Sequence, residues 1–274
     1  MKYGVEVINL GALADPRMIV KLAQAAEAGG WESLFVWDHL AFAWNVPASD
    51  PWITLAAVAS ATTRLRLGTA VTPLPRHHPH ILANMLASLD TLSDGRVTLG
   101  VGLGAQPQEY TAFGESADAK LHAAMVDESL EVLTQLWSGE KVDHHGAHYT
   151  VDNVTLTPLP VQRPRIPIWI GGVSVPALRR AARWDGWIIG AVSDDGRSML
   201  KTPEQMAEHI AIIRKHRTLT TPFDVAMTGY STPTEGSLAR EFEAAGVTWW
   251  LESLHLFRGT FDEMITRALA GPPR

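Results

Sequence analysis

The segment that decides the fold is Arg66–Gly114, which reads RLGTAVTPLPRHHPHILANMLASLDTLSDGRVTLGVGLGAQPQEYTAFG. It holds two short apolar runs, each ending in small residues and a polar loop, and the pattern predicts an amphipathic helix between them. If the two runs are parallel strands, Thr69–Thr72 and Gly102–Glu109 lie side by side at one rim of a sheet. Enzymes often bind cofactors where loops gather at one rim of a parallel sheet. We therefore expect the functional site at this rim.

The alternation of strand-like and helix-like segments extends along the whole chain. After a first strand at Tyr3–Leu10, Asp15 is a predicted helix N-cap, Pro16 takes the first helical position and Gly29–Gly30 end the helix. The later predicted strands are Ser33–Trp37, Arg66–Ala70, Val97–Val101, Ile168–Ile170, Trp187–Ile189, Asp224–Thr228 and Thr248–Leu251. Eight strand–helix pairs in about 250 residues predict an α/β fold, a (β/α)8 TIM barrel. We expect one domain over residues 1–274.

One segment interrupts the pattern of the barrel. Lys141–Pro167 contains strand-like pieces among His, Gly, Asn and Pro residues, so we expect a hairpin insertion between helix 4 and strand 5. A doubly wound open sheet is disfavoured, because Gly11-Ala12-Leu13-Ala14 follows the first strand in place of a dinucleotide-binding glycine fingerprint.

Composition limits the class of protein. With 46% hydrophobic and 19% charged residues, the chain has the balance of a soluble globular protein. Its net charge of −6 offers no basic surface for nucleic acid or an anionic membrane. The absence of cysteine excludes thiolate chemistry and favours a reducing compartment. The N-terminus resembles no signal peptide, and no apolar run reaches the length of a membrane span. We expect a cytoplasmic protein with no nucleic-acid or membrane partner.

The loops that follow the strands supply the candidate residues. His39, after the second strand, suits acid–base work because imidazole titrates near neutral pH. Alternatively, Asp38 and His39 only cap the strand. A direct pair between them is not expected, because adjacent side chains on a strand point to opposite faces. The other strand ends deliver Phe42, Trp44, Thr69, Val71, Thr72, Gly102, Gly104, Gln106, Glu109, Gly171, Gly172, Ser174 and Glu252.

Two glycine-rich turns suggest different ligands. In Gly171–Pro176, Ser174 is a predicted N-cap, and free backbone amides at a helix start favour a phosphate, although an ordinary tight turn explains the same pattern. In LGVGLG (residues 99–104) the spacing is GxGxG and no helix follows directly, so a dinucleotide loop is excluded. Bare backbone there suits either a flat ring or close packing of barrel layers.

Other chemistries lack support. The histidines of His77–His80 and His144–His148 have no carboxylate partner at a recognised ligand spacing, so no metal site is predicted and capping or solvated roles are expected. There is no GxSxG elbow for serine-based hydrolysis.

The motifs together resemble one family. Its characteristic run is similar to LSDGRVTLGVGLGAQPQEYTAFG (92–114), its second strand to WESLFVWDHL (31–40), and its fifth strand with phosphate loop to LTPLPVQRPRIPIWIGGVSVPALRRAARWDGWI (156–188). DPWITLAAVASATTRLRLGTAV (50–71) resembles the intervening helix and strand. The chain thus resembles the luciferase-like flavin-dependent oxidoreductases, which include bacterial luciferase-like monooxygenases and F420-dependent oxidoreductases. The likeness weakens after about Ala191.

The resemblance implies a barrel that holds a flavin-type cofactor, F420 or FMN. His39 would face the reactive part of the ring. Ala70 and Val71 would form a bulged strand end, often with a non-proline cis peptide, behind the ring. Thr72 and Glu109 would lie near the ring or its side chain.

The resemblance also assigns the remaining site residues. Trp44 would cover the substrate pocket. The implied catalytic residues are His39, Trp44 and Glu109. The implied cofactor-binding residues are Asp38, His39, Ala70, Val71, Thr72, Gly102, Gly104, Gly171, Gly172 and Ser174. Some F420 members carry an acidic residue directly after the position of Gly104, where this chain has Ala105-Gln106-Pro107, so a proton donor is left unassigned.

Three functions follow from these expectations. The short chain favours F420-dependent hydride transfer to or from a small, partly hydrophobic organic substrate. The first alternative is an FMN-dependent monooxygenase that uses reduced FMN and O2 and needs a separate reductase, because the chain has no NAD(P)H fingerprint. The second is a non-catalytic barrel that binds a flavin or another small ligand. The resemblance also implies a homodimer.

Overall fold

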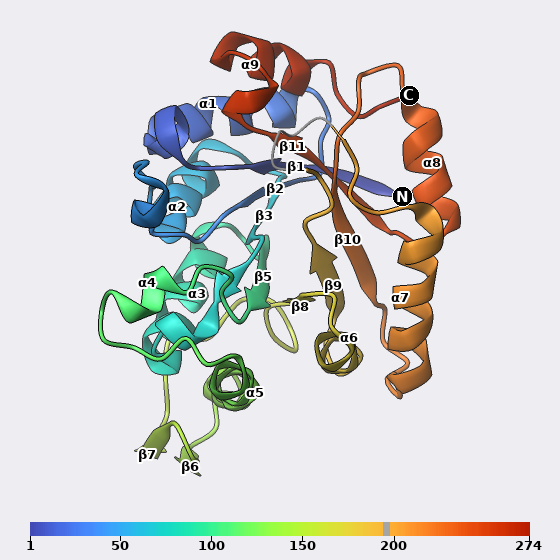
Figure 1. Cartoon of the computed structure of the whole chain (residues 1–274). Coiled ribbons are helices and arrows are strands. Elements are labelled where there is room, and N and C mark those ends of the chain that lie inside the picture. Colours follow the sequence, from blue (N-terminus) through green and yellow to red (C-terminus); the bar gives the residue numbers. More distant parts are fainter. Residues whose placement is uncertain (194–197) are drawn as a thin grey trace.

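Parallel strands close into a barrel in the computed structural model of the chain, which describes residues 1–193 and 198–274 (Figure 1). Strand β3 pairs with β5, and β11 pairs with β1, so the ring of hydrogen bonds is complete. The short β4 follows β3 after a break in the strand. Together β3 and β4 occupy one of the eight strand positions of the barrel. The barrel strands are β1 (Lys2–Val7), β2 (Ser33–Val36), β3 (Arg66–Thr69) with β4 (Thr72–Pro73), β5 (Val97–Gly102), β8 (Ile168–Gly171), β9 (Gly186–Ile189), β10 (Asp224–Gly229) and β11 (Trp249–Leu254).

Helices cover the outside of the barrel, as the sequence predicts for a (β/α)8 fold (Figure 1). In α1, the Asp15 side chain accepts the backbone N–H of Arg17 at 2.9 Å, Pro16 is the first residue and Gly29 is the C-cap. The covering helices are α1 (Pro16–Ala28), α2 (Pro51–Ala61), α3 (Pro79–Leu92), α5 (Ala119–Leu136), α6 (Val175–Ala181), α7 (Pro203–His216), α8 (Gly236–Ala244) and α9 (Phe261–Leu269). The predicted fold class is therefore confirmed.

Five short helical turns that the sequence pattern does not reveal occupy loops after the carboxyl ends of strands. They are η1 (Gly11–Ala14), η2 (Phe42–Trp44), η3 (Leu74–Arg76), α4 (Gln108–Thr111) and η4 (Leu256–Arg258). Each follows a barrel strand, so all belong to the rim where a (β/α)8 barrel carries its site.

Aromatic side chains fill the interior of the barrel. Phe35 stacks on Trp169 with ring centroids 5.2 Å apart, and Trp249 lies 5.7 Å from Trp169. These rings form a buried cluster against which Ala70 and Val71 pack. The carboxyl end of β3 is therefore packed against buried aromatic side chains on its inner side, which leaves the rim of the barrel for a ligand.

The predicted insertion is a two-stranded hairpin between α5 and β8 (Figure 1). Its strands are β6 (Val142–His145) and β7 (Thr150–Val154). The strand-like pieces expected at Tyr149–Val151 and Val154–Leu156 both overlap β7, whereas β6 was not predicted. Glu128 of α5 anchors the hairpin by accepting the backbone N–H groups of His148 and Tyr149 at 3.0 and 2.7 Å. Among the described residues, the helices are too short or too polar to cross a membrane.

Candidate functional site

A cavity of about 830 Å³ opens at the carboxyl rim of the barrel. That volume suits a cofactor-sized ligand. Its wall includes most of the predicted cofactor-binding residues, namely Asp38, His39, Ala70, Val71, Gly102, Gly104, Gly171, Gly172 and Ser174. Thr72, Trp44 and Glu109 do not line it. The rim predicted from the sequence is thus the place where the structure forms this cavity.

The wall behind the cavity is built on glycines. The Ala70–Val71 peptide is cis, as the resemblance implies. A Cβ atom on Gly102 would lie 2.7 Å from Cγ2 of Val71, and one on Gly100 would lie 2.0 Å from the backbone oxygen of Thr69. Gly100 therefore allows β3 and β5 to pack closely, whereas Gly102 leaves room for the Val71 side chain in the cavity wall. Close packing of the barrel layers is therefore seen at LGVGLG, whereas the flat ring against this wall stays a prediction.

Thr72 supports the wall from behind. Its hydroxyl donates to Thr69 Oγ1 at 2.9 Å, and Thr69 Oγ1 donates to the backbone oxygen of Gly100 at 3.0 Å. Both threonines are fully buried. Thr72 is therefore placed to hold the strand end that carries Ala70 and Val71.

A buried ion network centred on Arg76 joins three loops. Arg76 Nη1 donates to Glu109 Oε2 at 2.5 Å, and Nη2 donates to Asp38 Oδ1 at 2.5 Å and to the Asp38 backbone oxygen at 2.7 Å. His77 Nε2 lies 3.0 Å from Asp38 Oδ2. The Arg76, Asp38 and Glu109 side chains are at most 8% exposed. The sequence pattern gives no sign of Arg76, because its partners are far away along the chain.

Glu109 holds the loop that carries His39. Its Oε1 accepts the backbone N–H groups of Leu40 and Ala41 at 2.8 and 2.9 Å, and both carboxylate oxygens lie 3.1 Å from His39 Nδ1. A carboxylate that accepts this many donors leaves Nδ1 to carry the ring proton. Nε2 of His39 is then available to the cavity. As expected, Asp38 and His39 have separate partners.

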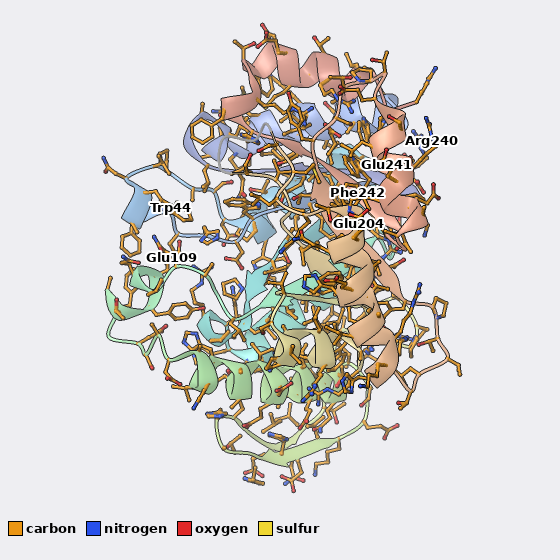
Figure 2. All side chains as sticks on the ribbon, turned by 45° about the vertical axis from the view of Figure 1, so that its right-hand side comes forward. Trp44, Glu109, Glu204, Arg240, Glu241 and Phe242 are labelled. Carbon is orange, nitrogen blue, oxygen red and sulfur yellow. The ribbon has the colours of Figure 1, made fainter. Side chains whose placement is uncertain are left out.

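Two tryptophans flank His39. The Trp44 ring centroid lies 4.8 Å from that of His39, and the Trp37 centroid lies 5.5 Å from it. Figure 2 shows Trp44 and Glu109 on neighbouring loops at one side of the molecule. Trp44 is 43% exposed, so its ring stands at the mouth of the site. Nearby, Phe42 packs edge-on against Phe113 at 5.7 Å.

Glu6 is a cavity residue that the sequence analysis missed. It lies on β1 and is buried, and its carboxyl group accepts Trp37 Nε1–H at 2.8 Å and the Ser253 hydroxyl at 2.9 Å. Burial raises the pKa of Glu6 to about 7, against the lowering effect of these two hydrogen bonds. The signal that could have revealed Glu6 is its position as the one charged residue in the otherwise apolar strand YGVEVINL.

The opposite end of the cavity combines bare backbone with cations. Gly171, Gly172 and Ser174 lie there, and the Ser174 hydroxyl accepts the Ala177 N–H at 3.4 Å as the predicted N-cap. Lys120 also lines this cavity, as does Arg180, whose guanidinium group is paired with Asp127 at 2.9 Å. Positive charge near exposed backbone is a setting for an anionic group of a ligand.

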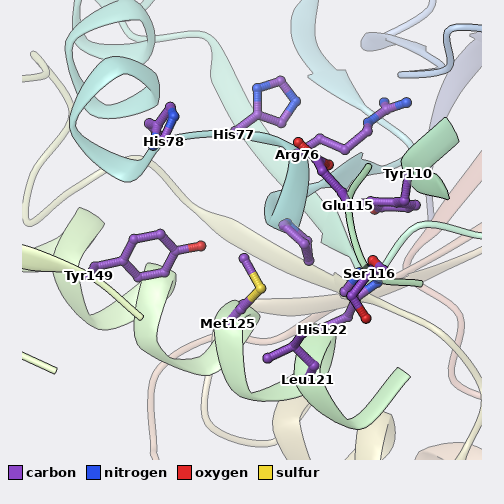
Figure 3. Close-up of a pocket in the computed structure, with 11 residues that line it drawn as sticks. Arg76, His77, His78, Tyr110, Glu115, Ser116, Leu121, His122, Met125 and Tyr149 are labelled. Atoms are coloured by element: carbon purple, nitrogen blue, oxygen red, sulfur yellow. Dashed lines mark hydrogen bonds between the residues drawn. The ribbon is translucent and has the colours of Figure 1, made fainter. Parts of the chain in front are cut away.

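A second cavity, of about 330 Å³, lies on the other side of the ion network (Figure 3). Arg76 and His77 line it, whereas their partner Asp38 lines the main cavity. In Figure 3, Tyr149 and Met125 face its interior from the hairpin and α5. The network is thus the partition between the two spaces.

Two further sets of candidates lie outside the main cavity. Glu252 is fully buried and bound by Ser231, Trp250 and Arg258, which is an arrangement that fastens loops. On the hairpin, Asp143, His145 and Asp152 are exposed, with one ligand atom from each within 4.8 Å of the others. The sequence has no carboxylate at a recognised ligand spacing from these histidines, and Asp152 comes beside His145 only across the hairpin. The prediction of no metal site stays a prediction.

Comparisons with known proteins show the family of the chain. The sequence model of the luciferase-like monooxygenase family matches residues 4–244. An F420-dependent glucose-6-phosphate dehydrogenase of Nakamurella multipartita is 38% identical over 180 residues, which are 63% of this chain and 52% of that protein. The chain thus spans about half the length of that relative.

Solved structures share the fold. An F420-dependent secondary alcohol dehydrogenase with an F420–acetone adduct superposes with a TM-score of 0.78 and 18% identity, over 98% of both chains. The oxygenating constituent of 3,6-diketocamphane monooxygenase from Pseudomonas putida, with FMN, superposes with a TM-score of 0.79 and 16% identity, over 98% of this chain and 96% of that one. At these identities the likeness is one of fold. The match over residues 4–244, together with the cavity at the barrel rim, means that this chain belongs to the luciferase-like monooxygenase family.

Proposed function

We propose that the protein is an F420-dependent oxidoreductase that transfers a hydride to or from a small, partly hydrophobic organic substrate. The observation that carries this proposal is the main cavity, in which a flat backbone wall at Ala70–Val71 lies near an oriented histidine, His39. Relatives named as F420-dependent dehydrogenases support it. When bound, F420 supplies or accepts the hydride through its ring.

The residues present fit such a cofactor. A Cβ atom on Gly190 would meet nothing within 4 Å, so the cavity is open at the end of β9 as well as over Val71. Gly171, Gly172 and Ser174 would hold its phosphate, with Lys120 near the anionic tail. The site therefore offers a flat surface for a ring and a polar end for its charged chain.

The residues around His39 have separate proposed roles. His39 Nε2 would donate or accept a hydrogen bond at the reacting end of the ligand, because Nδ1 is held by Glu109. Glu109, which is buried behind His39, is a positioning residue in this proposal. Trp44, beside His39 at the mouth, would cover the substrate and exclude water.

Titration of the purified protein with F420 and with FMN tests the choice of cofactor. We expect micromolar binding of F420, seen as quenching of cofactor fluorescence, and weaker binding of FMN. Micromolar binding of FMN with none of F420 would contradict the proposal.

Replacing His39 tests whether the barrel turns over its ligand. His39→Ala should lower turnover about 100-fold or more while F420 affinity stays close to that of the wild type. His80→Ala is the matched control, because His80 is exposed and lies outside both cavities. Equal rates for wild type and His39→Ala would favour a barrel that only binds its ligand.

An FMN-dependent monooxygenase is the second candidate, and the FMN-bound structural neighbour favours it. It would take reduced FMN from a separate reductase. Oxygen uptake by the protein with reduced FMN and an added ketone distinguishes it from the F420 proposal. A negative result with FMN and a positive one with F420 would remove this candidate.

We also propose a homodimer located in the cytoplasm. Exposed apolar side chains on the outside of α2 and α3, among them Ile53 and Ile81, support association of two copies. The cysteine-free composition supports a reducing compartment.

A further inference from the structure

Glu6 differs from the other carboxyl groups near the main cavity. Asp38, which also lines that cavity, is paired with Arg76 and His77. Glu6 has only neutral donors, Trp37 and Ser253, among its described hydrogen-bond partners. A buried carboxylate without a cation is costly, so burial favours the protonated form. Glu6 therefore keeps a proton to a higher pH than a paired carboxyl does.

The position of Glu6 connects it to the reacting end of the site. On β1 it lies in register with Phe35 of β2 and Ser253 of β11. Glu6 accepts the indole N–H of Trp37, and the same Trp37 ring flanks His39. Glu6 and His39 thus line the same cavity, and both contact Trp37.

The charged groups around Glu6 are occupied elsewhere. Asp38 and His39 of the adjoining loop bind Arg76 and Glu109. Glu252, beside Ser253 on β11, binds Arg258. The titratable or charged groups on the elements that surround Glu6 are Asp38, His39, Glu252, His255, and, across the cavity, Lys120 and Arg180. Burial, and not a neighbouring charge, is the main influence on Glu6.

We propose that Glu6 exchanges a proton with the substrate bound in the main cavity, as the proton partner of the hydride transfer. This inference rests on the proposed function. In the reducing direction, a substrate carbon receives a hydride and the electron pair of its double bond moves to the adjoining atom. The O–H bond of the Glu6 carboxyl group breaks and its proton joins that atom. The remaining carboxylate is held by Trp37 Nε1–H and the Ser253 hydroxyl, and water restores the proton.

The proposal supplies a group that the sequence left unassigned. Ala105-Gln106-Pro107 offers no acid directly after Gly104. Glu6 reaches the cavity from a different strand, and its pKa of about 7 suits transfer in both directions at neutral pH.

Glu6→Gln tests the inference, since the amide keeps the size of the side chain and cannot release a proton. The first readout is ¹³C NMR of glutamate carboxyl carbons in the cofactor-free protein. We expect one resonance with a midpoint near pH 7, absent in Glu6→Gln and moved to higher pH in Ser253→Ala, which removes a donor to the carboxylate. If Glu6→Gln does not fold, Ser253→Ala still decides this readout. Persistence of the resonance in Glu6→Gln, or an unmoved midpoint in Ser253→Ala, overturns the inference.

The second readout is hydride transfer with 2-cyclohexen-1-one and reduced F420, and with propan-2-ol and oxidised F420. We expect Glu6→Gln to be at least about 100-fold slower, without the wild-type pH dependence near 7, at unchanged F420 affinity. Asp90→Asn is the control, because Asp90 is buried on α3, is bound by Gln162 and lies outside the cavity. Wild-type rates in Glu6→Gln refute this inference alone. A wild type that binds no F420, or reacts with neither probe, refutes the proposed function and the inference together.

Discussion

At the scale of single residues, Arg76 and Glu109 decide the shape of the reacting end. Glu109 accepts two backbone N–H groups as well as Arg76 and His39, so its charge fixes the loop after β2. Glu109→Gln leaves Arg76 with a single carboxylate and brings amide hydrogens to a site that requires an acceptor. We expect a loss of about 3 kcal/mol in the free energy of unfolding, measured by urea denaturation. Glu115→Gln, at an exposed position of the next loop, should change it by less than about 0.5 kcal/mol.

Glu6 makes stability depend on pH. Its pKa is about 7 in the folded protein against an ordinary value of 4.5, so the folded state holds the additional proton between these values. The free energy of unfolding therefore falls as pH rises from 4.5 to 7, by about 3 kcal/mol from this group, and then levels off. Glu6→Gln should become more stable than the wild type by that amount across this window. Urea denaturation at several pH values measures the difference, and Glu208→Gln, which is exposed, should show none.

The sequence predicted His39 because one titratable side chain at a strand end is visible in the pattern. It did not predict Arg76 or the partners of Glu6. Arg76 reaches Asp38 and Glu109 over 38 and 33 positions, and such distances along the chain acquire meaning only when the barrel closes.

At the scale of elements, capping residues and apolar periodicity were sufficient for the first covering helix, α1. The boundaries of α1 agree with the prediction from Asp15, Pro16 and Gly29–Gly30. The first strand ends at Val7, three residues earlier than predicted, because Ile8–Leu10 turns into η1. Turns such as η2 and α4 have too few residues for a periodic pattern, so the rim was the least predictable part.

The wall of β5 gives an element-scale prediction. A methyl group at position 102 would lie 2.7 Å from Cγ2 of Val71, so Gly102→Ala should push Val71 into the cavity. We expect F420 affinity to fall about tenfold or more, together with a lower melting temperature. Gly190→Ala is the matched control for folding, because its methyl group meets no atom within 4 Å, and it should melt like the wild type. Unchanged F420 binding in Gly102→Ala would contradict a ring seated against Val71.

At the scale of the whole molecule, closure of the barrel could be predicted by counting strand–helix pairs. The count does not reveal that β3 and β4 share one position around a break, since the second piece has only two residues. The break is where Ala70 and Val71 face the cavity, so the part of the fold that departs from regular structure is also the part that forms the site. Local patterns describe regular elements, whereas this site depends on an irregular one.

The outer surface gives the last prediction. Helix α2, PWITLAAVASA, is apolar on nearly all sides, and a helix of this kind is usually covered on its outer face too. Ile53 on α2 is 66% exposed and Ile81 on the neighbouring α3 is 59% exposed. Burying each isoleucine side chain against a second copy of the chain would contribute about 2 kcal/mol to the free energy of association. A lysine at either position would oppose association, because its charge would have to be buried. The double variant Ile53→Lys/Ile81→Lys should therefore sediment as a monomer, whereas the wild type should sediment as a dimer. Leu219→Lys, in the loop after α7, should leave the dimer intact, and a double variant that remains dimeric would place the interface on another face.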